Sequence, residues 1–203
     1  MSERVCFLCE DDDAERNFGK ESQCPVCSPV VDFSKVSAHR VLEHNAAHLL
    51  FDPHVSILDQ PCGLCLRPAP ACRFYLKKGK GSKSTLQLDM EKSVCANKLK
   101  FQYAVAEQSS SSAPTSNIPI KCPECKDPKA PAIWRYLLPY HLKETHKLNN
   151  LEPHSPLWEI TDSERSQLKT VWKERHTVKR SRKTKRGPSF QISEAHSTRL
   201  ALR

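Results

Sequence analysis

The spacing of the cysteines constrains this chain more than any other feature of its sequence. Eight of its ten cysteines stand in four Cys-x2-Cys pairs within 203 residues. A Cys-x2-Cys turn aims two sulfur atoms at one point, as in tetrahedral metal sites, so metal binding is the first hypothesis for their role. The four pairs are Cys6/Cys9, Cys24/Cys27, Cys62/Cys65 and Cys122/Cys125.

The composition supports that hypothesis. Hydrophobic residues make up 38% of the chain and aromatic residues 7%, which is too little apolar material for one large core. No apolar run reaches the ~18–20 residues of a membrane helix, and residues 1–13 carry acids where a signal peptide has its apolar segment. We therefore expect a soluble, non-exported protein without a membrane partner. Because cytosolic and nuclear thiols are kept reduced, the cysteines are expected to bind metal instead of forming disulfides.

A helix that carries three histidines follows the second cysteine pair. We expect it to begin after an N-cap at Ser34 and to end at Pro53. Two of its histidines, four residues apart, share a helix face and suit one zinc ion together with the cysteines. The alternative pair, His39 and His44, also has a zinc-like spacing and stays open. The preferred ligands are Cys24, Cys27, His44 and His48.

The last cysteine pair repeats this pattern and gives the clearest metal motif. Fifteen residues separate the pair from a His-x4-His motif on a second predicted helix. Pro139 lies inside the helical stretch, so the helix should kink there or begin anew. Leu138 occupies the apolar position before the first histidine, where zinc-finger helices pack on their core. The expected ligands are Cys122, Cys125, His141 and His146.

Between these two motifs lies a third candidate site made of cysteines alone. Predicted strands at Cys72–Leu76 and Thr85–Leu88, joined by a loop at Gly79–Ser84, would return the chain to the metal. The alternative is that the two later cysteines are only buried thiols. The expected ligands are Cys62, Cys65, Cys72 and Cys95.

Cys6 and Cys9 have no unique assignment. They can join Cys24 and Cys27 in a four-cysteine site, which would release the helix histidines. They can also recruit His39 and a distant ligand as a fourth site. The sequence leaves both alternatives open, and we expect about three structural zinc ions.

These motifs predict a small α+β protein of zinc-stabilised modules. A serine-rich linker with almost nothing to bury marks a domain boundary. After it, Thr161 and Glu164 fit a capping box, and Leu168, Val171 and Trp172 form the apolar face of a helix expected to pack on its own domain. The expected units are an acidic lead (1–21), a zinc-finger-like module with two cysteines and two histidines (22–60), a β-rich four-cysteine module (61–106), the linker (107–117), a second zinc-finger-like module (118–150), the amphipathic helix (151–178) and a disordered basic tail (179–203).

The charge of +9 is concentrated near the C-terminus, where residues 173–186 carry eight bases and one acid. Such a segment releases counterions from phosphates, so the leading hypothesis is a nuclear protein that contacts DNA or RNA. A nuclear-import signal is the simpler interpretation of the same run, and a protein-interaction adaptor without nucleic-acid binding is the rival function. The basic residues concerned are Lys179, Arg180, Arg182, Lys183, Lys185 and Arg186.

No catalytic motif is evident in the chain, and no small-molecule substrate is suggested. Each candidate site closes with four protein ligands, whereas catalytic zinc usually keeps an open position for water. The chain has neither an HExxH motif nor a phosphate-cradling glycine loop, and it holds only five glycines. We therefore expect a protein that is not an enzyme.

The chain resembles a group of zinc-finger-like proteins from mushroom-forming fungi in several strings of its sequence. These are CPVC, LEHNAAHLLFDP and PCGLCLRPAPACRFYLKKGKG, followed by a serine-rich stretch and by CPEC with IWRY and His-x4-His. The resemblance covers roughly residues 24–175. It implies small zinc modules, with His44 and His48 favoured over His39 as ligands. It implies no activity.

Overall fold

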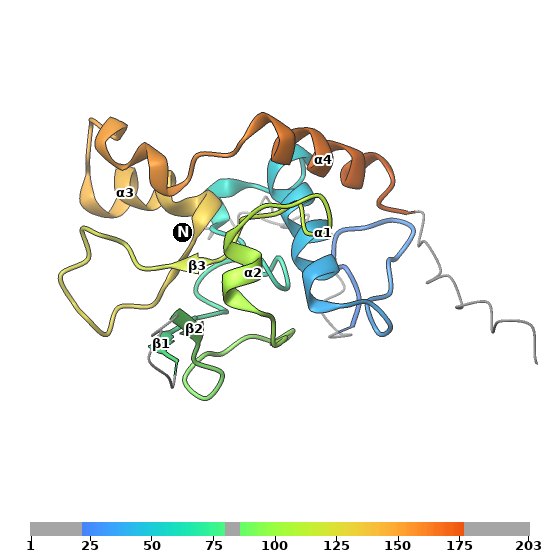
Figure 1. Cartoon of the computed structure of the whole chain (residues 1–203), viewed down its shortest axis with the longest axis horizontal. Helices are drawn as coiled ribbons and strands as arrows, with labels where there is room; N and C mark the ends of the chain where they lie inside the picture. The colour runs from blue at the N-terminus through green and yellow to red at the C-terminus, as the bar shows by residue number, and fades with distance from the viewer. Residues whose placement is uncertain (1–21, 80–85, 177–203) are drawn as a thin grey trace, which may run out of the picture.

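The computed structural model describes residues 22–79 and 86–176. The structure combines short helices with two small antiparallel sheets, of which the β1–β2 pair lies at the lower edge in Figure 1, so the α+β class is confirmed. The acidic lead, the pair Cys6/Cys9 and the basic tail lie outside the described residues. In chain order, the elements are α1 (Ala38–Phe51), η1 (Ile57–Asp59), β1 (Leu76–Lys78), β2 (Leu86–Leu88), α2 (Tyr103–Glu107), β3 (Pro119–Ile120), β4 (Ile133–Trp134), η2 (Arg135–Leu137), α3 (Leu138–His146), η3 (Glu152–Leu157) and α4 (Asp162–Lys173).

The longest helix, α1, begins one turn later than expected. Its N-cap is Ser37, whose side chain accepts a hydrogen bond from the Arg40 amide. Ser34, the expected cap, instead donates its hydroxyl to Asp32 over 2.9 Å within the preceding turn. The helix ends before Pro53 as predicted. Within the described ranges, no helix combines the length and apolarity needed to cross a bilayer.

The strands are shorter than the sequence suggested. β1 pairs with β2 in antiparallel register, with Leu76 opposite Leu88. The segment expected to start β1 is not a regular strand, because its successive residues pair with different partners. Arg73 bridges Val94, whereas the Phe74 carbonyl accepts from the Ala132 amide over 2.7 Å. Phe74 thereby ties the four-cysteine segment to the strand before α3.

One hydrophobic cluster joins segments from both sides of the serine-rich stretch. It contains Leu42 of α1, Phe74, Ile118 and Trp134, and the Phe74 and Trp134 rings meet edge to face at 5.1 Å. Residues 113–119 are all buried. The expectation of a linker with nothing to bury is therefore wrong for this half of the segment, and the expected boundary does not separate two cores.

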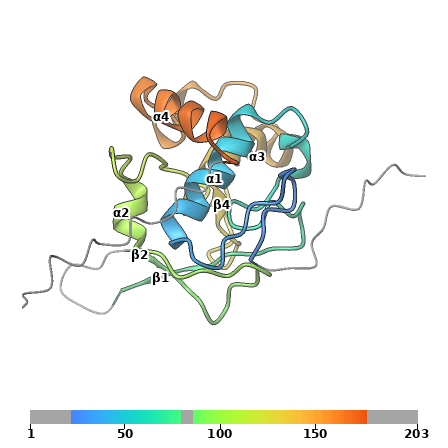
Figure 2. The ribbon, with the colours of Figure 1, turned by 90° about the vertical axis from the view of Figure 1, so that its right-hand side faces the viewer.

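The last helix, α4, lies across α1 in both ribbon views (Figures 1 and 2). Leu168 is fully buried against Ala46 of α1 and Tyr136 of η2. The expectation that this amphipathic helix packs on its own chain is confirmed. Its apolar face is therefore occupied in this structure.

The capping box at the start of α4 forms only in part. The Thr161 side chain accepts from the Glu164 amide over 3.1 Å, as a capping box requires. The Glu164 side chain turns into the core, where its carboxylate accepts from the backbone and hydroxyl of Ser116 and from the Tyr136 hydroxyl. Glu164 is 2% exposed, so this buried carboxylate pins α4 to residues 113–119.

We expect Glu164→Ala to lower the free energy of unfolding by about 3 kcal/mol, because three buried donors lose their acceptor. Glu164→Gln should cost about 1 kcal/mol, since an amide oxygen can keep part of the network. Urea unfolding of the metal-loaded protein measures both changes. Glu159→Ala, an exposed acid before the same helix, is the matched control. Equal stability of Glu164→Ala and this control would contradict the anchoring role.

Candidate metal centres

Three clusters in the described residues bring four sulfur or nitrogen atoms together. In each cluster, the ligand atoms all lie within 4.8 Å of one another, and each cluster can hold a metal ion. We name them site A, site B and site C in chain order. The clusters are Cys24, Cys27, His44 and His48 (site A), Cys62, Cys65, Cys72 and Cys95 (site B), and Cys122, Cys125, His141 and His146 (site C).

Several distances between ligand atoms are close to the edges of a zinc tetrahedron, while the Cys65–Cys72 and Cys27–His48 distances, 3.4 and 3.2 Å, are shorter. With Zn–S and Zn–N bonds of about 2.3 and 2.05 Å, those edges are about 3.8 Å between sulfurs, 3.6 Å between sulfur and nitrogen and 3.3 Å between nitrogens. The Cys62 and Cys95 sulfurs are 3.7 Å apart. The His48 Nε2 atom lies 3.5 Å from the Cys24 sulfur and 3.1 Å from His44 Nε2. A disulfide needs about 2.05 Å between sulfurs, so these thiols are free.

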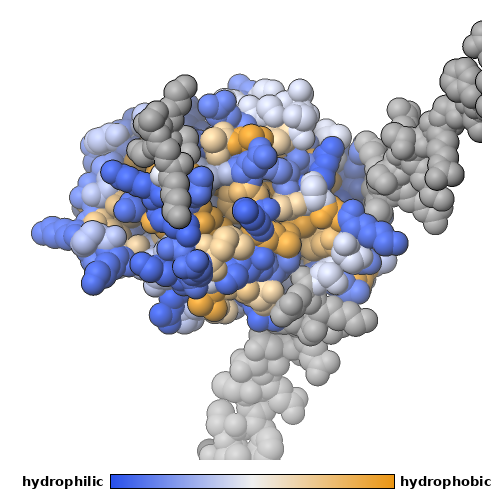
Figure 3. All heavy atoms as spheres, turned by 60° about the horizontal axis from the view of Figure 1, so that its bottom comes forward, coloured by the Kyte–Doolittle hydropathy of each residue, from blue (hydrophilic) through white to orange (hydrophobic). Residues whose placement is uncertain are grey.

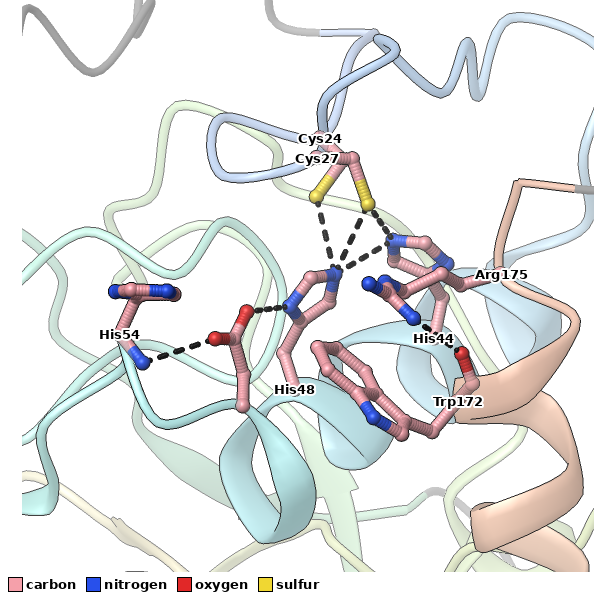
Figure 4. A network of polar contacts seen from close by, with 8 residues as sticks. Cys24, Cys27, His44, His48, His54, Trp172 and Arg175 are labelled. Atoms are coloured by element: carbon pink, nitrogen blue, oxygen red, sulfur yellow. Dashed lines mark hydrogen bonds and ion pairs between the residues drawn. The ribbon is translucent and has the colours of Figure 1, made fainter.

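Site A is assembled by a cysteine turn and by one face of α1. The Cys24 amide donates to the Val31 carbonyl over 2.9 Å, which closes the turn, and the Phe33 ring meets His44 edge to face at 5.1 Å. His44 and His48, one turn apart on α1, point their Nε2 atoms at the cysteines (Figure 4). The structure thus places His48 in the cluster and leaves His39 outside it.

A carboxylate orients one of the site A histidines. The Asp52 Oδ2 atom lies 2.7 Å from His48 Nδ1, and the other oxygen of Asp52 accepts from the His54 amide over 2.9 Å (Figure 4). A hydrogen bond at Nδ1 fixes the ring and leaves the Nε2 lone pair free for a metal. Asp52, the C-cap residue of α1, was not among the expected site residues. Its spacing of four residues from a predicted ligand at the end of the same helix was the available signal.

Helix α4 covers the other side of site A. The Trp172 ring meets the His48 ring edge to face at 5.0 Å, and the Arg175 guanidinium lies 3.7 Å from the centre of the indole. A pocket of about 320 Å³ lies beside these residues, and Cys27 is part of its wall. The end of α4 therefore forms part of the surroundings of the metal ligands.

Site B is closed by an isolated bridge beside the predicted hairpin, not by the pairing of the two predicted strands themselves. Cys72 and Cys95 directly flank an antiparallel bridge in which Arg73 and Val94 exchange both backbone hydrogen bonds, of 2.9 and 2.8 Å. This bridge brings the two distant cysteines to the turn that holds Cys62. Burial, with further contributions from the neighbouring thiols, raises the pKa of Cys62 well above its usual value. All four groups could therefore be ionised together only beside a cation such as a metal ion.

The cysteine turn of site B is held by its neighbours. The side-chain amides of Asn45 and Asn97 donate to the carbonyls of Gly63 and Leu64 over 3.1 and 2.9 Å. A Cβ atom at Gly63 would lie 2.5 Å from the Trp134 ring, so only glycine fits there. The PCGLC string therefore supplies two metal ligands and, at Gly63, a close contact with the Trp134 ring in the core.

Site C is carried by a second cysteine turn and by α3. The proline at position 139 lies in the first turn of α3, directly after η2, so the helix begins anew there as one of the two expected outcomes. Leu138 and Leu142 are fully buried beneath Cys122. Burial and then the neighbouring histidine lower the pKa of His141, which keeps the imidazole neutral and able to bind metal.

We expect Asp52→Asn to weaken metal binding at site A by about 10- to 100-fold, because the His48 ring loses its orienting carboxylate. Competition with a chromophoric chelator should then show one ion released early while sites B and C keep theirs. Asp59→Asn, an exposed acid on η1, is the matched control. Release of all ions at the unsubstituted rate from Asp52→Asn would contradict the role given to Asp52.

Comparison of the chain with protein-family models, with curated proteins and with solved structures found no match. The resemblance to fungal zinc-finger-like proteins stays a prediction. The functional argument therefore rests on the three clusters and on the surfaces that surround them.

Proposed function

We propose that the chain binds three structural zinc ions and acts in the nucleus by contacting nucleic acid. The observation that supports zinc is the convergence of four thiolate or imidazole donors at three points with tetrahedral spacing. Thiolate and imidazole groups are the ligands that zinc prefers in closed structural sites. Cys6 and Cys9 remain candidates for an additional site.

A structural role fits these sites better than a catalytic one. Each cluster supplies four protein ligands, whereas catalytic zinc usually keeps an open position for water or substrate. The pocket beside site A touches Cys27 and His48, but both are already ligands of the closed set. The ions would instead contribute folding free energy, on the order of 10 kcal/mol per site in isolated fingers.

We expect elemental analysis to find three zinc ions per chain, or four if Cys6 and Cys9 complete another site. His48→Ala should remove one ion relative to the unsubstituted protein because site A loses a ligand. His39→Ala should leave site A loaded, since His39 lies outside the cluster. Loss of the site A ion from His39→Ala alone would contradict the ligand choice, and a chain without zinc would overturn the zinc proposal.

Basic segments support the nucleic-acid part of the proposal. Lys77 and Lys78 are exposed on β1, and the C-terminal run adds six further cations in sequence. Such charges bind phosphates largely without regard to sequence. Recognition through a finger-like helix is less well supported, because α1 is buried from Val41 to Leu49 and lies beneath α4.

In the rival proposal, the chain is a protein-interaction adaptor, and the apolar face of α4 docks on a partner. That face packs on α1, with Leu168 fully buried. A partner could reach it only if α4 left its place beside site A. The apolar face of α4 is therefore not available for that docking.

We expect the zinc-loaded protein to bind DNA or RNA at low salt and to release it as salt rises. Replacing the six tail cations Lys179, Arg180, Arg182, Lys183, Lys185 and Arg186 by Gln should weaken binding and flatten its salt dependence, because fewer counterions are released. Fluorescence anisotropy across a salt series measures both effects. An unsubstituted protein that binds neither DNA nor RNA at low salt would overturn the nucleic-acid proposal and favour the adaptor.

A further inference from the structure

The outward face of the β1 segment combines positive charge with an aromatic ring. Phe74 is 2% exposed and Leu76 packs against the same core cluster, so these two residues point inward. Side chains alternate along an extended chain, so Arg73 and Lys77, which are exposed, and Tyr75, which is half-buried, share the opposite side. We call the surface made by these three residues and their partners across the strands the outer face.

Cross-strand pairing completes the outer face. Arg73 lies opposite Val94, and Lys77 lies opposite Gln87. Directly opposite residues project from the same side of a sheet, so Val94 and Gln87 belong to this surface. Val94 is 61% exposed, which is unusual for a valine within a pairing segment and leaves an apolar contact open. On the side that Figure 3 brings forward, apolar and hydrophilic side chains are interleaved.

Positive charge dominates this part of the chain. Residues 71–105 hold eight Lys and Arg and two acids, a net charge of +6. The acid nearest the outer face, Asp89, is largely buried, and its oxygen lies 3.5 Å from the Lys77 Nζ atom. An ion pair with a half-exposed lysine is weak, so a phosphate can compete for Lys77.

The outer face is fixed in place by site B. Cys72 precedes Arg73, and Cys95 follows Val94, so two metal ligands sit at the same end of the surface. A bound metal ion would hold the two chains of the bridge together without help from a long sheet. Such preorganisation lowers the entropy cost of binding a partner to these side chains.

We propose that the outer face binds single-stranded nucleic acid, with Tyr75 stacking on a base and with Arg73 and Lys77 contacting the flanking phosphates. Alternate residues of a strand are about 6.6 Å apart, which places a cation on each side of the ring along the direction of the bound strand. Base stacking on an aromatic ring needs an exposed base face, which a single strand offers and a duplex conceals. This inference rests on the proposed nucleic-acid function and adds its surface and its substrate class.

The test uses the zinc-loaded, full-length protein and measures anisotropy of a labelled single-stranded oligonucleotide, in DNA and RNA form, beside the matching duplex. We expect tighter binding of the single strand than of the duplex. Tyr75→Ala should weaken single-strand binding about tenfold, and Tyr75→Phe should retain it because the ring remains. Arg73→Gln with Lys77→Gln should weaken it by a similar factor and reduce the salt dependence.

The matched control is Arg165→Gln with Lys169→Gln, which removes the same charge from exposed positions on α4, at the opposite edge of the molecule from β1 in Figure 1. It should stay within about twofold of the unsubstituted protein, because charges farther apart than a Debye length are largely screened. Repeating the series in the six-substitution tail variant removes the contribution of the tail. Zinc content and thermal unfolding show whether each variant is folded. If Tyr75→Ala does not fold, the variant with Arg73→Gln and Lys77→Gln still tests the proposal.

Two results separate this inference from the proposed function. If the protein binds nucleic acid but the Tyr75 and Arg73/Lys77 variants behave like the control, the outer face is not the binding surface, and the proposed function stands. Equal binding of duplex and single strand would also overturn the inference alone. If the unsubstituted protein binds no nucleic acid, both proposals fail.

Discussion

The structure depends on the convergence of soft ligands at three points. Among the described residues, the strands are two or three residues long and the longest helix has 14 residues, so regular secondary structure alone contributes little stability. At each cluster, a cysteine turn and a second segment far away in sequence meet at one position. A metal ion there would join segments that a small apolar core holds only weakly, which suits a chain with 38% hydrophobic residues.

The three clusters are not structurally independent of one another. Site B lies within the main hydrophobic cluster, where Gly63 contacts the Trp134 ring of β4. Site A lies between α1 and α4, and Trp172 of α4 contacts a ligand ring. Site C packs against the neighbouring strand β4 and against the buried leucines of α3. Ile120 and Ile133 pack against both the main cluster around site B and the leucines beneath site C, so these two sites share part of their packing.

The same arrangement explains where binding surfaces are left. α1 carries two ligands and is buried on several sides, so it is not free to act as a recognition helix. The apolar face of α4 is used to cover α1. The segment beside site B, by contrast, leaves Arg73 and Lys77 exposed on either side of the half-buried Tyr75. A metal ion at site B would hold this surface directly, because Cys72 and Cys95 flank the bridge between Arg73 and Val94.

Much of this arrangement follows from the sequence alone. The four-cysteine and cysteine–histidine spacings predicted which twelve side chains meet, because a short turn or a single helix face leaves few ways to aim a pair of donors. The start of α3 at Pro139 and the Thr161 cap of α4 are likewise local, since a proline ring or a single hydroxyl decides them.

Other features required the tertiary structure, because they depend on partners distant in sequence. Residues 113–117 belong to the stretch expected as a linker (107–117), yet they are buried, and Glu164 and Tyr136 form hydrogen bonds with Ser116 and Asn117. The cap of α1 is a local exception: Ser37 caps the helix in place of the expected Ser34, which bonds to Asp32. Asp52 gains its role only because α1 carries it to His48 beside the cysteines of another segment. Sequence thus determined which atoms can bind metal, and tertiary packing decided which surfaces are buried around them, since burial is the sum of contacts that no local pattern encodes.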